Sequence, residues 1–160
     1  MRTIIPTALL AAVLVLAPPA LAGGLDGTWV LVRQVYGEGR HNFAGPDRPF
    51  RLVFETGAGA PSARAERDGS TAPWPCWFTP GGPVEVQDPV VTRDPDGRGV
   101  TASYRVPPAP GDDTWLIVTE RYRVTDDDRL AGTVEVRFER HGVPRGGFTW
   151  RRTFRREEGR

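Results

Sequence analysis

Three successive segments near the C-terminal end of the chain alternate apolar with polar residues, and this alternation constrains the fold most. In the segment 130–140, Val134, Val136 and Phe138 alternate with charged residues, and the segments 114–124 and 148–155 show the same period. A period of two is typical of a strand with one buried face. An Asp-rich break and a Gly-rich break separate the three segments, so the sequence predicts an antiparallel meander.

Similar patterns extend toward the N-terminal half of the chain. We expect strands in the segments 28–36, 50–55, 84–87, 90–92 and 100–106. The segment 58–69 fits a polar strand or one to two helical turns, and alternating Ala63 and Ala65 favour the strand. Three prolines between residues 72 and 80 argue against a central strand there. With about eight strands and no clear helix, the fold class is all-β: an antiparallel meander that closes into a barrel, or alternatively a curved β-sandwich.

The N-terminal residues 1–22 fit a secretory signal peptide. Arg2 precedes a short apolar run, and Ala20-Leu21-Ala22 fits the small-residue cleavage pattern. The run is shorter than the ~20 apolar residues that a membrane-spanning helix needs. We therefore expect residues 23–160 to form a single secreted or periplasmic domain that does not span a membrane after cleavage.

Charge and cysteine content narrow the function classes. The chain has 21 basic and 20 acidic residues, and this balance argues against nonspecific nucleic-acid binding, which needs excess positive charge. Cys76 is the only cysteine, so an intramolecular disulfide is excluded and stability must come from the core.

The entry to the first strand carries a resemblance. Gly27-Thr28-Trp29, a few residues after the expected cleavage point, resembles the G-x-W entry of lipocalin-like barrels. The resemblance implies that Trp29 closes one end of a barrel of about eight strands and that a late-strand arginine stacks over it. Four arginines are candidates for that place: Arg151, Arg152, Arg155 and Arg156. The resemblance also implies that the loop 37–49 covers the barrel mouth.

Catalytic and metal sites find little support. Cys76 with His41 or His141 would be needed for a thiolate nucleophile, but tryptophans flank Cys76 and favour a buried, inert thiol. The acidic stretches 94–98 and 126–128 lack the ligand spacing of a calcium loop. Haem held by one of the two histidines stays an alternative without a supporting pattern. We expect no enzyme activity, no metal and no cofactor.

The aromatic residues are the better indication of function. Trp74 and Trp77 lie in the Pro-rich segment, Trp115 and Trp150 lie on expected strands, and Arg152 shares the aromatic face of the last strand. Barrel mouths lined by aromatics with a few polar groups hold hydrophobic ligands, and Glu120 is the candidate partner of Arg152. The predicted function is binding of a small apolar or amphiphilic ligand by these five residues. The alternative is a structural or protein-interaction module with a filled core, in which the Pro-rich segment plugs the barrel end.

Overall fold

The computed structural model describes residues 23–37, 41–42, 50–55 and 62–158. The expected signal peptide lies outside these residues, as does most of the predicted lid loop 37–49. Within the described ranges, no helix is long and apolar enough to cross a membrane. Every element of regular structure assigned in these ranges is a strand.

The described residues form twelve strands, in agreement with the predicted all-β class. They are β1 Gly27–Tyr36, β2 His41–Asn42, β3 Phe50–Glu55, β4 Ser62–Arg67, β5 Ser70–Pro73, β6 Trp77–Thr79, β7 Gly82–Val84, β8 Gln87–Arg93, β9 Gly99–Val106, β10 Thr114–Val124, β11 Arg129–Arg140 and β12 Val143–Arg156.

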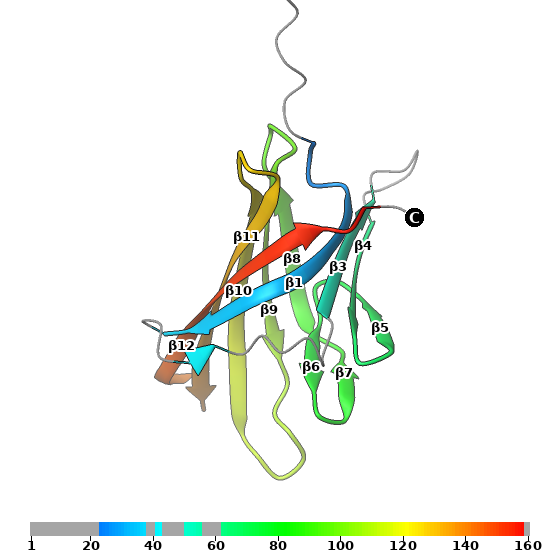
Figure 1. Ribbon diagram of the computed structural model, residues 1–160. Helices are drawn as coiled ribbons and strands as arrows, with labels where there is room; N and C mark the ends of the chain where they lie inside the picture. Colours follow the sequence, from blue (N-terminus) through cyan, green and yellow to red (C-terminus); the bar gives the residue numbers. More distant parts are fainter. Residues whose placement is uncertain (1–22, 38–40, 43–49, 56–61, 159–160) are drawn as a thin grey trace, which may run out of the picture.

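Nine of these strands form one strongly curled sheet, a half-barrel (Figure 1). Their order is β5-β4-β3-β1-β12-β11-β10-β9-β8, and β2 pairs with β1 beside this path. All pairings are antiparallel. The predicted meander is confirmed as β10–β11–β12, and the chain's first long strand, β1, pairs with its last, β12.

The sheet curls around one apolar face, here called the concave face. Strands β9, β10 and β11 place their buried residues at every second position, as the period of two requires. Trp29, Leu52, Phe54 and Phe154 come from β1, β3 and β12 and join the same core. The opposite face of the curled sheet is mostly solvated, although Val53 on the other side of β3 is also buried.

The segment between the sheet edges differs most from expectation. Residues 62–67 form a strand, which confirms the favoured alternative, and β5 follows it through a two-residue turn. The Pro-rich segment then leads into a separate hairpin, β6–β7, whose residues Trp77, Phe78 and Val84 pack against the core. The predicted strand 84–87 is wrong, because β7 ends at Val84 and β8 begins at Gln87. The predicted strand 90–92 is part of β8, which continues through Asp88 and Pro89 with a bulge, where an edge strand tolerates a proline.

Candidate ligand-binding site

Strand register places a row of polar residues across the middle of the concave face. Arg152 on β12 lies opposite Gln34 on β1 and opposite Gly132 on β11. Gly132 in turn lies opposite Tyr122 on β10. Because Gly132 has no side chain, Tyr122 and Arg152 meet above it, and an added Cβ at Gly132 would lie 2.4 Å from Tyr122 Cε1.

A buried carboxylate stands in the next row. Glu120 is 4% exposed and is the buried charged residue of the core. Its carboxylate accepts hydrogen bonds from the hydroxyls of Tyr104 and Tyr122, the latter at 2.7 Å, and from Trp74 Nε1 at 3.2 Å. Three donors on one buried carboxylate offset its loss of water.

Arg152 connects to this carboxylate through a tyrosine. Its Nη1 donates to the Tyr122 hydroxyl at 2.9 Å, and its Nε donates to Gln34 Oε1 at 2.8 Å. The guanidinium also lies over the rings of Phe50 and Trp150, at 5.0 and 5.2 Å from their centroids. The predicted partnership with Glu120 is therefore indirect, because the register puts Tyr122 between the two charges.

The two phenols and the guanidinium of this network have defined charges near neutral pH. Burial, followed by the charge of Glu120, raises the pKa values of the Tyr104 and Tyr122 phenols above their ordinary range. Burial alone would lower the pKa of Arg152, but Tyr122 and Glu120 outweigh it, and the pKa is raised. The row therefore holds neutral phenols beside a permanent cation.

Inward-facing aromatic residues at one end of the concave face are only partly buried; we call this the aromatic end. Phe148 and Trp150 on β12 and Phe138 on β11 are half-buried, and Tyr36 on β1 is 36% exposed. Ring contacts join these residues, with centroids 4.9 Å apart for Phe148 and Trp150 and 5.6 Å for Phe138 and Phe148. Inward rings that keep solvent contact can cover a ligand.

The two tryptophans of the Pro-rich segment take different positions. Trp74 is buried, donates to Glu120 and meets Phe54 and Tyr122 edge to face. Trp77 is half-buried on β6 and stacks on Trp150, with centroids 5.8 Å apart and planes at 11°. The structure thus brings Trp74, Trp77, Trp150 and Arg152 together on the concave face.

Trp115 does not join them. It alternates with Leu116 and Val118 on β10 and so faces the opposite side of the sheet. There Arg105 lies over its ring at 4.4 Å, and Arg105 pairs with Glu139 at 3.5 Å. In the sequence, Trp115 lies one residue out of phase with Leu116 and Val118. That phase was the signal that could have separated Trp115 from the other four predicted residues.

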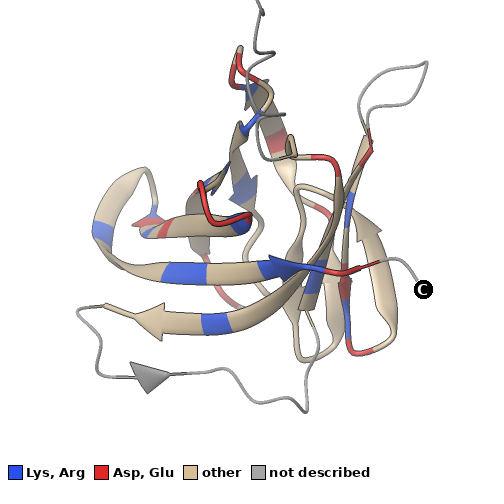
Figure 2. Cartoon of the chain, turned by 45° about the horizontal axis from the view of Figure 1, so that its top comes forward, with Lys and Arg blue, Asp and Glu red and all other residues tan. Residues whose placement is uncertain are grey.

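The outer face carries charges in two arrangements. Arg121 on β10 and Glu135 on β11 form an exposed cross-strand ion pair of 3.0 Å. Arg33, Arg151 and Arg155 are exposed on β1 and β12 and have no carboxylate within ion-pair distance among the described residues. Figure 2 shows basic residues along these two strands, while many acidic ones lie in turns.

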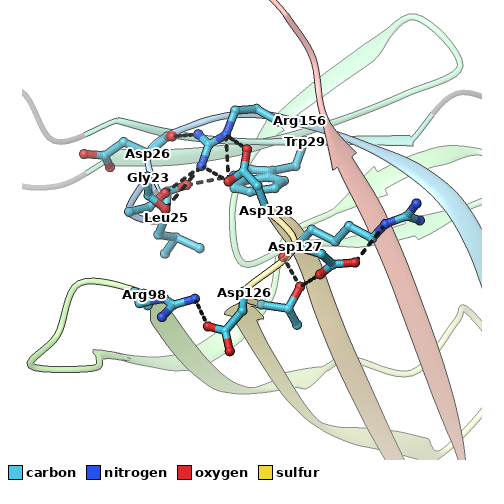
Figure 3. A network of polar contacts seen from close by, with 12 residues as sticks. Gly23, Leu25, Asp26, Trp29, Arg98, Asp126, Asp127, Asp128 and Arg156 are labelled. Carbon is cyan, nitrogen blue, oxygen red and sulfur yellow. Dashed lines mark hydrogen bonds and ion pairs between the residues drawn. The ribbon is translucent and has the colours of Figure 1, made fainter. Parts of the chain in front are cut away.

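The other end of the half-barrel is sealed; we call it the closed end. Trp29 is 0% exposed, and its Nε1 donates to the Leu25 carbonyl at 2.7 Å. Arg156 lies over the Trp29 ring at 4.2 Å, pairs with Asp128 at 3.1 Å and donates to the Gly24 carbonyl at 2.9 Å (Figure 3). One guanidinium thereby ties the N-terminal segment to the β10–β11 turn.

Among the described side chains, Cys76, His141 and the acidic turns make no second site. Burial and the charge of Glu120 raise the pKa of Cys76 to about 12, so its thiolate is scarce. His141 pairs with Asp113 at 2.9 Å in an exposed turn. Asp126 and Asp128 pair with arginines, and no group of three or more potential ligands gathers in the described ranges.

Of the four candidate arginines in the last strand, Arg156 lies over the Trp29 ring. No known protein-family model matches the chain, and none of the curated proteins matches it.

Proposed function

We propose that the protein is a lipocalin-like carrier, secreted or periplasmic, that holds a small apolar or amphiphilic ligand against its concave face. The apolar part of the ligand lies on the aromatic end, beside Trp77 and Trp150. Its polar end, where it has one, points toward Arg152. The sheet edges β5 and β8 then complete a barrel around the ligand together with the β6–β7 hairpin.

One observation supports the proposal above the others: the two ends of the concave face differ in exposure. At the closed end, Trp29 and Leu25 are 0% and 1% exposed, whereas inward-facing Phe148, Trp150 and Phe138 are only half-buried at the aromatic end. A core that only packs the sheet would bury these three inward rings instead of leaving them in contact with solvent. Binding a ligand there removes apolar surface from water, which is favourable.

Binding is proposed in place of catalysis because the reactive groups are unsuited to chemistry. The Cys76 thiol has a raised pKa, and the Glu120 carboxylate already accepts three hydrogen bonds. A thiolate nucleophile needs a lowered pKa.

A filled structural module is the second candidate. The stack of Trp77 on Trp150 favours it, because a hairpin that covers the concave face can replace a ligand. In that case the protein acts through its surface and binds no small apolar molecule.

Displacement of the neutral dye Nile red distinguishes the two. We expect the dye to brighten on binding the mature protein, and C10 alkyl compounds to displace it. Trp150→Leu should weaken binding about tenfold, which corresponds to ~1.4 kcal/mol. Trp115→Phe is the matched control and should bind as the wild type does, because Trp115 faces the opposite side. Absence of dye binding by the correctly folded wild type would favour the filled module.

A further inference from the structure

We infer that the ligand carries an uncharged hydrogen-bond acceptor, an amide, carbonyl or alcohol oxygen, and that Arg152 binds this group in preference to a carboxylate. The inference rests on the proposed function and specifies its ligand class. It follows from the unused donors of Arg152 and from the charge of the network behind it.

Arg152 has donor capacity to spare. Its Nε and Nη1 are engaged by Gln34 and Tyr122, but Nη2 has no hydrogen-bond partner among the described residues. A guanidinium carries five N–H donors in one plane. The side chain is only partly buried, and the rings of Phe50 and Trp150 lie beside it. An acceptor at the polar end of a ligand lying on Trp150 therefore meets an unused N–H.

The charge of Arg152 is already balanced. The buried Glu120 lies in the neighbouring row of the concave face. The Tyr122 hydroxyl connects the two charges, because it donates a hydrogen bond to Glu120 and accepts one from Arg152. The remaining groups that face this pair, Tyr104, Trp74, Gln34 and Cys76, are uncharged at neutral pH, since the pKa values of Tyr104 and Cys76 are raised. The network as a whole is neutral.

A carboxylate head group would add a net negative charge to this site. It would lose hydration on entering and would be repelled by Glu120 at low local dielectric. The hydrogen bond that a neutral acceptor accepts from Nη2 is weaker than the charge-assisted one of a carboxylate, but a neutral acceptor has neither cost. For a ligand with a fixed alkyl chain, the amide should thus bind more tightly than the ionised acid.

The test compares decanamide, decanoate and decane by Nile red displacement at pH 7.5. We expect wild-type protein to bind decanamide about tenfold more tightly than decanoate, the effect of one uncompensated charge at partial burial. In Arg152→Met, the affinity for decanamide should fall to that for decane, and the affinity for decane should stay as in the wild type. Glu120→Gln removes the balancing charge and should shift the preference toward decanoate.

A measurement on the wild type alone guards against variants that fail to fold. Decanoate binding should strengthen as the pH falls through the ordinary pKa of the free acid, because the protonated acid is a neutral acceptor. Decanamide binding should not change over that range. Tighter binding of decanoate than of decanamide at pH 7.5 would overturn the inference, as would equal binding of all three compounds. Failure of all three to displace the dye from folded protein would instead overturn the proposed function.

Discussion

Gly132 is the residue on which the polar row depends. Its register partners are Tyr122 on one side and Arg152 on the other, and a methyl group at this position would meet the Tyr122 ring at 2.4 Å and 2.5 Å. Both contact atoms belong to a buried ring whose hydroxyl is fixed by Glu120 and Arg152. The ring cannot move without breaking those hydrogen bonds.

Gly132→Ala should therefore lower the free energy of unfolding by about 1–3 kcal/mol, the usual effect of overpacking a core. Urea unfolding followed by circular dichroism measures it. Gly81→Ala is the control, because a Cβ there meets only Thr79 Oγ1 at 3.6 Å, and its effect should stay within about 0.5 kcal/mol. Equal midpoints for the two variants would show that Tyr122 can relax.

Among the elements, β12 carries contacts to both ends of the half-barrel. Phe148 and Trp150 stand at the aromatic end, whereas Arg156, eight residues after Phe148, holds the closed end. The arginine serves three elements at once: the Trp29 ring on β1, the Asp128 carboxylate in the β10–β11 turn and the carbonyl of Gly24. The N-terminal segment is also held by the buried Leu25 side chain, by the Leu25 amide, which donates to the Gly97 carbonyl, and by the Trp29 indole, which donates to the Leu25 carbonyl.

Arg156→Ala should thus lower the free energy of unfolding by about 1–3 kcal/mol, from a cation–π contact of ~0.5–2 kcal/mol and the lost ion pair. Hydrogen exchange should become faster at the amide of Leu25. Arg155→Ala is the matched control on the neighbouring position, since Arg155 is exposed and without a described carboxylate partner. If both variants unfold at the same urea concentration, the contacts of Arg156 add no stability.

Over the whole molecule, local sequence patterns predicted the long strands, whereas the cross-strand register determines which side chains meet at the candidate site. The period of two identified β3, β9, β10, β11 and β12, and the β-branched and aromatic residues of the segment 28–36 identified β1. The same pattern gave no information about β5, β6 and β7, because these strands are short, β5 and β7 contain prolines and Pro80 follows β6 directly. Likewise, a face pattern placed Arg152 and Glu120 on the inside, but only the pairing of three strands shows that Tyr122 separates them.

The polar network in the middle of the core makes the stability of the molecule sensitive to alkaline pH. Tyr104 and Tyr122 are neutral in the folded state, with pKa values raised by burial and then by Glu120. In the unfolded chain both ionise near pH 10. Above that pH the unfolded state releases protons that the folded state keeps, so the stability present below pH 10 is lost as the pH rises.

Each of these tyrosines should lower the free energy of unfolding by about 1.4 kcal/mol per pH unit above pH 10. Urea midpoints between pH 8 and pH 11.5 measure the slope, and absorbance at 295 nm should show the two buried phenolates forming only as near-ultraviolet circular dichroism is lost. Tyr104→Phe removes one of the two groups and should reduce the slope by that group's share. A midpoint that stays level from pH 9.5 to 11.5 would mean that both phenols ionise within the folded protein, which a carboxylate beside them opposes.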